Sequence, residues 1–412
     1  MLESGRLREN HCSQFRGDMM RIGYLTLGSE ANFLDRNSFD LSWGIRVPLI
    51  KSLQHQDIEV VILSPMSRVD ERYKKYKTLR KPPEWFQKLE YRFKPEFEKS
   101  DLEDLDLLFI ECGSTNTTMG RDGISYFEVV TNALKVWEGN VIYYQHSPVL
   151  YYPFGEYFSD KPIKNISDKN LRVQVKKARI FENKEWLVIH HARNENKWIE
   201  QMYCRNSMRY KDVKDRVGDQ LEFKYIPLPY DLREEKRYSP ACGEKWDSIF
   251  IGGRYSSSSM NYARNKTDRY PILKRFFYRS SFRHAIIGKF WDNVKDLNVL
   301  GPIGKPYDVT RLYNWSLVGL WTDSEFVLET EFWITRYIFI LMGGNLLVAD
   351  TSHTLACDYV NKEFHVSNQK DLEELIDWYK DLSTEEKEEI RIKQEKRFPS
   401  WFDIDWKRIF NY

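Results

Sequence analysis

The chain has 412 residues, of which 42% are hydrophobic, 15% aromatic and 30% charged, and this balance excludes a protein that is disordered throughout. Its 63 basic and 61 acidic residues nearly cancel to a net charge of +2, so contact with a polyanion would depend on local basic patches. At about 100–200 residues per domain, the length favours two domains.

Nothing in the sequence indicates export or a membrane. The longest nearly apolar run, residues 337–349, is shorter than the roughly 20 residues that a membrane-spanning helix needs. Residues 1–19 carry no apolar signal core and are expected to be a disordered extension. The five cysteines match no disulfide framework or zinc-ligand spacing, which fits a reducing compartment. We therefore expect a cytoplasmic protein without a membrane span.

Short apolar runs alternate with helical patterns in the first half of the chain. Strands are predicted at 21–27, 59–64, 107–112, 141–144, 186–189 and 223–226. Apolar spacing predicts helices at 44–56 and 126–137. The charged and aromatic segment 66–104 breaks the alternation, and we expect an insertion beside the sheet.

The second half repeats the pattern. Strands are predicted at 248–251, 285–287, 299–300, 317–320, 345–349 and 363–366, followed by a helix at 370–382. The alternation predicts an α/β fold with two Rossmann-like parallel-sheet domains at 20–230 and 247–395, joined by a linker at 231–246. The tail 396–412 is expected to form a helix that returns to the first domain. Ligands bind at the carboxyl ends of parallel strands, so residues that end strands become the candidates for an interdomain site.

Two strand ends of the first domain attract attention. Gly28 follows the first strand, where it permits either close approach of a ligand or an ordinary tight turn. His146 ends a strand and would either contact a ligand and move a proton or cap the next element. The adjacent His190 and His191 point to opposite faces of a strand, which argues against a shared metal site.

The first strand of the second domain runs into Gly252, Gly253 and Arg254. A glycine-rich turn after a strand presents backbone N–H groups to an anion, and Arg254 with Lys266 would add positive charge. A flexible loop with a solvated arginine is the alternative, and we favour the anion site.

Carboxylates cluster before the last apolar helix. One of the carboxylates Glu325, Glu329 and Glu331 would hold a ribose diol, and Arg336 would pair with a phosphate or with one of these glutamates, unless the acidic residues simply favour a helix start. Gly343 and Gly344 then form the turn into the next strand.

Positive charge is concentrated in three runs. Residues 161–184 hold eight Lys/Arg against two Asp/Glu, 205–216 five against two, and 264–283 seven against one. Basic runs with interspersed aromatics suit a nucleic acid, although a solvated face explains any single run. The candidate contacts are Lys176, Lys177, Arg179, Arg205 and Arg209.

Several catalytic motifs are missing. The sequence contains no Walker A loop, GxSxG elbow, HExxH or supported DxD pattern, which argues against a kinase, a hydrolase, a metalloprotease or a metal-dependent transferase. No metal site is predicted.

Together these features resemble the GT-B glycosyltransferases, in which two Rossmann-like domains face a cleft. The Gly-Gly-Arg turn and the stretch 336–350 resemble the signatures of that class. Within it, VIYYQHS (141–147), LVIHHARNENKW (187–198) and IGGR (251–254) resemble the DNA α-glucosyltransferases of bacteriophages.

The resemblance implies a hexosyl- or pentosyltransferase that moves a sugar, glucose first, from a UDP-sugar to 5-hydroxymethylcytosine or another 5-hydroxymethylated pyrimidine in double-stranded DNA. It implies retention of configuration, no bound cofactor and no metal for donor binding. His146 would be catalytic, and His191 would join the basic residues on the DNA. The donor would contact Gly28, Gly252, Gly253, Arg254, Lys266, Glu329, Glu331, Arg336, Gly343 and Gly344.

Two positions depart from the family pattern. Ser147 stands where the family has an aspartate, and Ile338 where retaining members have a glutamate. The sugar therefore stays open, and an arabinosyl or other pentosyl donor is an alternative. The wider alternatives are a transferase acting on a glycan or cell-surface polymer and a non-enzymatic two-lobe binding protein.

Overall fold

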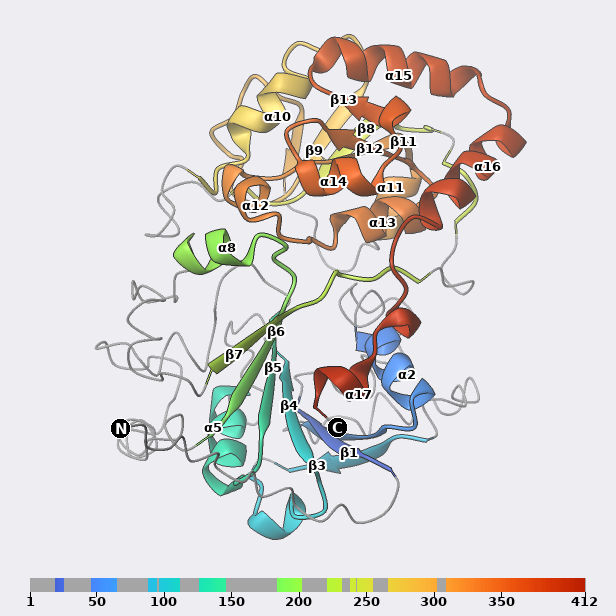
Figure 1. Ribbon diagram of the computed structural model, residues 1–412. Helices are drawn as coiled ribbons and strands as arrows, with labels where there is room; N and C mark the ends of the chain where they lie inside the picture. Colours follow the sequence, from blue (N-terminus) through green and yellow to red (C-terminus); the bar gives the residue numbers. More distant parts are fainter. Residues whose placement is uncertain are drawn as a thin grey trace, which may run out of the picture.

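A computed structural model describes residues 19–25, 46–64, 88–94, 96–111, 126–145, 184–201, 221–231, 238–241, 243–254, 266–301 and 309–411. These residues form two α/β domains, one above the other in Figure 1, each built on a parallel sheet. The predicted fold class is thereby confirmed. Every predicted strand overlaps a strand of the structure.

The first domain has a seven-stranded sheet in the order β3-β2-β1-β4-β5-β6-β7. Its strands are β1 (Arg21–Leu25), β2 (Glu59–Ser64), β3 (Glu90–Phe93), β4 (Leu107–Glu111), β5 (Val141–Gln145), β6 (Trp186–His190) and β7 (Leu221–Tyr225). Its helices are α2 (Val47–His55), η2 (Lys99–Asp101), α5 (Tyr126–Val136) and α8 (Glu195–Gln201). All neighbouring strands are parallel.

Strand β3 corrects the expectation that segment 66–104 lies wholly beside the sheet. It pairs with β2 and forms the edge of the sheet. Charged residues alternate along this strand, so it is not a continuous apolar run and the sequence pattern did not predict it. Glu90 accepts hydrogen bonds from Arg21 and Arg92, and Arg92 also donates to Asp104, so polar contacts at the sheet edge replace the apolar burial of the inner strands.

The second domain has a six-stranded sheet in the order β10-β9-β8-β11-β12-β13. Its strands are β8 (Trp246–Ile251), β9 (His284–Ile287), β10 (Val299–Gly301), β11 (Ser316–Trp321), β12 (Leu346–Asp350) and β13 (His365–Val366). Its helices are α10 (Tyr270–Phe277), α11 (Val309–Asn314), α12 (Glu325–Thr330), α13 (Arg336–Met342), α14 (Thr354–Tyr359), η5 (Lys362–Phe364), α15 (Gln369–Asp381) and α16 (Thr384–Glu395).

Both sheets share one winding. Each adds strands first to one side of its first strand and then to the other, so the order reverses between β1 and β4 and between β8 and β11. In open parallel sheets this reversal separates the flanking loops and opens a crevice outside the carboxyl ends of the strands. Each domain therefore has one position that topology alone marks for a ligand.

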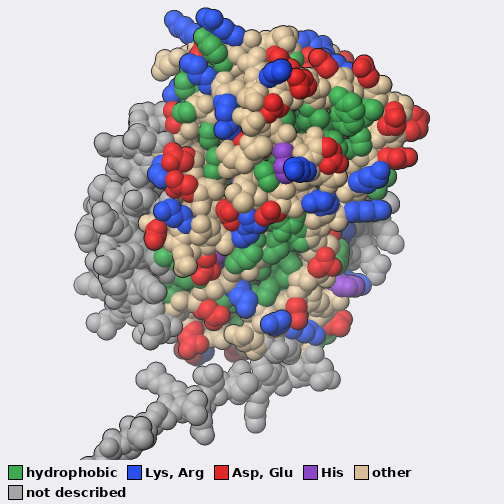
Figure 2. Space-filling model, turned by 45° about the horizontal axis from the view of Figure 1, so that its top comes forward, with side chains coloured by type: hydrophobic (Ala, Val, Ile, Leu, Met, Phe, Trp, Pro, Cys, Tyr) green, Lys and Arg blue, Asp and Glu red, His purple; other side chains and the backbone are tan. Residues whose placement is uncertain are grey.

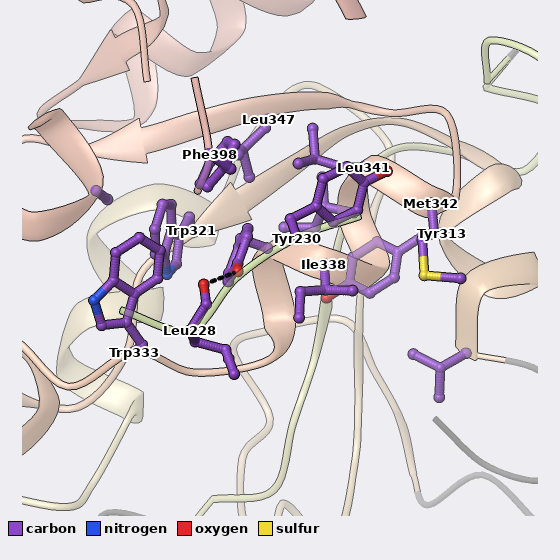
Figure 3. Close-up of a cluster of buried hydrophobic side chains, with 14 of the residues drawn as sticks. Leu228, Tyr230, Tyr313, Trp321, Trp333, Ile338, Leu341, Met342, Leu347 and Phe398 are labelled. Atoms are coloured by element: carbon purple, nitrogen blue, oxygen red, sulfur yellow. Dashed lines mark hydrogen bonds between the residues drawn. The ribbon is translucent and has the colours of Figure 1, made fainter. Parts of the chain in front are cut away.

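The two domains share a continuous apolar core (Figure 3). Leu228 and Tyr230, which follow β7, are buried among side chains of the second domain. The Tyr337 hydroxyl donates a hydrogen bond to the Leu228 carbonyl, and the Phe398 ring stacks on Tyr337 with centroids 4.7 Å apart. The chain thus crosses between the domains inside a packed cluster of aromatic rings.

The C-terminal tail crosses back to the first domain, where α17 (Trp406–Ile409) lies beside α2 (Figure 1). A 3-10 turn, η6 (Trp401–Asp403), precedes it. The Trp406 indole donates to the Ser52 hydroxyl at 2.8 Å, and the Trp406 backbone N–H donates to the Gln56 side chain at 2.9 Å. Since Trp406 is fully buried, the tail completes the core of the first domain.

We predict that Trp406→Ala lowers the free energy of unfolding by about 3–5 kcal/mol, because it empties a buried indole site and leaves the Ser52 hydroxyl without its donor. Urea unfolding followed by circular dichroism measures this loss. Phe402→Ala, at a ring that is 42% exposed in the same tail, is the matched control and should change the stability much less. Equal losses for the two variants would contradict the proposed docking.

Candidate functional site

Several predicted site residues lie outside the described residues and stay predictions. They are Gly28, His146, Lys176, Lys177, Arg179, Arg205 and Arg209. The described part of the site therefore comes from the strand ends of the second domain and from the residues that face them.

The turn after β8 packs tightly against the turn after β9. A Cβ on Gly288 would lie 2.1 Å from the Gly252 carbonyl oxygen, so only glycine fits at position 288. The Gly252 N–H donates to the Ile287 carbonyl at 2.8 Å, and its carbonyl accepts from the Trp291 indole at 2.9 Å. The Gly252 amide is therefore used inside the protein, which corrects the expectation that it faces an anion.

The turn after β11 carries a buried carboxylate, Asp323, at the reversal point of the sheet. Its Oδ1 accepts from Arg269 Nε at 2.8 Å and from the Ser324 N–H at 2.7 Å, and its Oδ2 accepts from Arg336 Nη1 at 2.8 Å. Burial raises the pKa of Asp323, but the two guanidinium charges and the hydrogen bonds outweigh it and hold the pKa well below its ordinary value. Asp323 thus holds two guanidinium groups, one on each carboxylate oxygen.

Gly252 lies over this pair of arginines. A Cβ at position 252 would be 3.0 Å from Arg336 Nη2 and 3.5 Å from Arg269 Nη1. The Arg336 guanidinium also lies on the Phe250 ring, 4.1 Å from its centroid, and Arg269 Nη1 donates to the Gly253 carbonyl at 2.7 Å. Both guanidinium groups therefore lie within contact distance of position 252.

Arg254 and Lys266 lie at the same edge with carboxylate partners. Arg254 makes a two-pronged contact with Asp268, Nε to Oδ1 at 2.9 Å and Nη2 to Oδ2 at 2.8 Å, and this contact raises the pKa of the guanidinium. Lys266 Nζ contacts Glu329 and, at 3.3 Å, Glu325, and the hydrogen bond to Glu329 raises the pKa of the ammonium. A phosphate contact by Arg254 or Lys266 stays a prediction.

The two candidate ribose carboxylates have different partners. Glu329 binds Lys266, whereas Glu331 accepts from Arg193 Nε at 2.6 Å and ends α12 in a left-handed conformation with φ of 49°. Glu331 thus faces the first domain. A ribose contact by Glu329 or Glu331 stays a prediction.

Gly343 and Gly344 lie at the other end of the sheet from Arg254. They cap the end of α13 immediately before β12 begins, so they belong to its amino edge. Gly344 has φ of +79°, and a Cβ there would lie 2.3 Å from the Ser239 carbonyl. The structure therefore assigns these glycines to a tight turn and separates them from the other predicted donor residues.

His191 is buried instead of facing a DNA surface. Its Nδ1 donates to the Ile226 carbonyl at 3.0 Å, since a carbonyl only accepts, and its Nε2 forms a hydrogen bond with the Tyr144 hydroxyl at 2.8 Å. Its backbone carbonyl accepts from the Trp333 N–H at 3.0 Å. This correction makes His191 a structural connector between strands and domains.

The basic run 264–283 is also engaged inside the protein. Five ion pairs join it to carboxylates of its own domain: Lys266–Glu329, Arg269–Asp323, Lys274–Asp296, Arg275–Asp350 and Arg283–Asp247. Figure 2 shows basic and acidic side chains interspersed over the face of the molecule that it presents. The run therefore does not offer a row of unpaired charge to DNA, which corrects its interpretation as a polyanion-binding patch.

The carboxyl edges of the two sheets face each other. Residues that follow β6 pair with residues that follow α12, through an antiparallel bridge between Ala192 and Phe332 and an N–H donated by Arg193 to the Glu331 carbonyl at 3.2 Å. The Tyr337 contact with Leu228 repeats this arrangement after β7. The strand ends of both domains thus lie on the interdomain side.

The first domain has its own buried carboxylate at the reversal point, which the sequence analysis missed. Glu111 ends β4 and accepts from Arg46 Nε at 2.7 Å and from the Tyr24 hydroxyl at 3.0 Å. The sequence does contain a signal for this residue, because an acid ends the otherwise apolar strand LLFIE. Asp323, which follows the apolar strand β11, gives a similar signal.

Two hollows among the described residues lie elsewhere. One of about 370 Å³ borders α15 and β13, and one of about 660 Å³ borders the amino edge of the first sheet near Asp106. Among the described residues, no helix is both long and apolar enough to cross a membrane, and no group of three or more metal-ligating side chains is found.

This arrangement of two facing parallel-sheet domains is the GT-B fold. Among solved structures, the chain is similar to T4 phage BGT in complex with its UDP-glucose substrate, with a TM-score of 0.58 and 14% identity, and to T4 phage BGT with UDP and Mn²⁺, with a TM-score of 0.60 and 15% identity. It is also similar to the DNA-modifying enzyme beta-glucosyltransferase, with a TM-score of 0.57 and 13% identity.

All three alignments cover 95% of this chain and 100% of the other. At these identities the likeness establishes the fold. No protein-family model and no curated protein matches the chain.

We predict that Glu111→Ala lowers the free energy of unfolding by about 3–5 kcal/mol, because it removes the carboxylate from a buried guanidinium. The double variant Arg46→Met with Glu111→Leu should recover most of the loss, since it removes both charges and keeps the volume. Urea unfolding curves for the single and double variants test this. A double variant as unstable as Glu111→Ala would show that packing, not charge, causes the loss.

Proposed function

We propose that the protein is a UDP-sugar-dependent glycosyltransferase that transfers glucose to a 5-hydroxymethylated pyrimidine in double-stranded DNA. The observation that carries the donor half is the pair of guanidinium groups, Arg269 and Arg336, that Asp323 holds at the topological ligand position of a GT-B fold. Support for the donor comes from the T4 phage structures, which hold UDP-glucose or UDP. Support for DNA comes from the similarity to a DNA-modifying enzyme and from the sequence motifs.

The proposed chemistry requires stabilisation of a leaving nucleoside diphosphate. Negative charge develops on the diphosphate as the bond to the sugar breaks, and fixed cations in a sheltered site stabilise it most effectively. Arg269 and Arg336 are already oriented by Asp323, so little reorganisation accompanies the reaction. Arg254 and Lys266 lie at the rim, where they would meet the phosphates from outside.

The acceptor half rests on the first domain. A base in a duplex must leave the stack to reach a site between two domains, and basic residues would hold the backbone meanwhile. We assign His146 as the group that positions or deprotonates the hydroxymethyl oxygen. Retention of the anomeric configuration and donor binding without a metal are part of the proposal. NMR of the product measures the anomer, and transfer in the presence of EDTA tests the metal, because one T4 phage structure holds Mn²⁺ with UDP.

A second function shares this donor site but uses a glycan as the acceptor. The observation that favours it is the pairing of the 264–283 cations with carboxylates, which removes one of the three basic runs from a DNA surface. Glycan transfer needs no such surface.

A transfer assay tests the proposal directly. Labelled nucleotide sugars are offered with DNA that carries 5-hydroxymethylcytosine, 5-hydroxymethyluracil or only ordinary bases, and with a panel of glycans. We expect label only in hydroxymethylated DNA and the fastest transfer from UDP-glucose. Label only in a glycan would support the second function, and the absence of both transfer and nucleotide-sugar hydrolysis would contradict both.

Two substitutions should separate the donor and acceptor roles. Arg254→Ala is expected to weaken UDP binding and turnover together, because it removes a cation from the edge of the site. His146→Ala is expected to lower kcat while UDP affinity stays near that of the wild type. Steady-state kinetics and titration calorimetry with UDP measure both effects. Wild-type behaviour of Arg254→Ala would make the phosphate assignment wrong.

A further inference from the structure

Asp323 holds two guanidinium groups that come from different elements. Arg269 immediately precedes α10 and Arg336 is the first residue of α13, and each binds a different oxygen of the buried carboxylate. We infer that Asp323 is the positioning residue of an anion subsite, which aims both arginines at a diphosphate arriving over Gly252. This inference rests on the proposed function for the identity of the ligand as the diphosphate of a nucleotide sugar.

The geometry leaves each guanidinium one orientation. Arg336 also donates to the Thr322 carbonyl and, at 3.4 Å from Nε, to the Ile251 carbonyl. Arg269 is held by the Gly253 carbonyl. A free arginine side chain loses rotamer entropy when a ligand orders it, so fixing it before the ligand binds removes that cost from binding. The backbone carbonyls alone supply no charge to hold two cations together.

Asp323 could affect diphosphate binding by positioning the arginines or simply through its charge, and these two effects have opposite signs. Asp323 carries a negative charge inside a site for anions, so its charge by itself weakens the binding of a diphosphate. Its hydrogen bonds act in the opposite direction, because they hold Arg269 and Arg336 where the ligand needs them. If Asp323 is neutralised without a change of shape, the affinity for a diphosphate should fall if Asp323 positions the arginines. The affinity should rise if Asp323 acts only through its charge.

The test is Asp323→Asn, with inorganic pyrophosphate as the probe in titration calorimetry. Positioning predicts that pyrophosphate affinity falls at least tenfold although the site becomes more positive. A charge effect alone predicts tighter binding, and unchanged or tighter binding would overturn the inference.

The matched control is Asp247→Asn, which removes the same charge from a buried aspartate that binds Arg283 at the other end of β8. Pyrophosphate binding should be unchanged in this variant.

A second variant keeps all three charged residues. Gly252→Ala places a methyl group 3.0 Å from Arg336 Nη2, 3.1 Å from the Phe250 ring and 3.5 Å from Arg269 Nη1, so the Arg336 and Phe250 side chains must shift by a few tenths of an ångström and the methyl group covers the face where the anion is expected. Gly252 has no positive φ, and the added methyl group need not strain the backbone. We expect a similar loss of pyrophosphate binding with a melting temperature near that of the wild type. Wild-type affinity in a folded Gly252→Ala variant would overturn the inference even if Asp323→Asn does not fold.

Kinetics distinguish positioning from general damage. Asp323→Asn should raise the KM for UDP-glucose more than it lowers kcat, the affinity for uridine should not change, and Asp323→Glu should restore part of the loss. Equal losses for uridine and pyrophosphate would indicate a structural role and overturn the inference.

The inference and the proposed function can fail separately. If the wild-type protein binds pyrophosphate but not UDP-glucose, the anion subsite is supported and the proposed donor is contradicted. If the wild-type protein transfers glucose but the Asp323→Asn variant binds pyrophosphate with full affinity, the proposed function is supported and the inference is overturned. Wild-type protein that does not bind pyrophosphate would overturn the inference in either case.

Discussion

The buried contact of one carboxylate with two guanidinium groups organises the second domain. A buried charge is tolerated only when it is paired and hydrogen-bonded, so Asp323 requires Arg269 and Arg336 to be in place. Through them it connects the turns after β8 and β11 with the start of α13. Because removing any member would leave a buried charge poorly compensated, these three segments hold one arrangement, and that arrangement is the candidate site.

The first domain places a buried carboxylate at the same position. Its sheet reverses between β1 and β4, where Glu111 pairs with Arg46. In the second domain Asp323 binds two arginines at the reversal between β8 and β11. Two sheets of the same winding thus each hold a buried contact between an acid and arginine at the reversal point.

The connections between the domains limit how the two strand edges move. The bridge between Ala192 and Phe332, the enclosed segment at Leu228 and the tail at Trp406 join the domains at separate places. Phe332 and the α12 residues Phe326 and Val327 belong to the apolar core of the first domain, although their segment follows a strand of the second. Helix α12 carries the carboxylates that bind Lys266, so the first domain helps to place a cation of the proposed donor site.

The alternation of apolar runs with helical spacing determined the two α/β domains, because each strand buried on both faces must be apolar along its length. It missed β3, whose Glu90 and Arg92 are stabilised by charges from elsewhere in the chain. Strand ends at Gly252 and Arg254 were also visible in the sequence. Only the tertiary structure decided that His191 is a buried connector, that Lys266 meets Glu329 and that Asp323 binds two arginines. Ion pairs join residues that are distant in sequence, and no local pattern specifies which cation a carboxylate will meet.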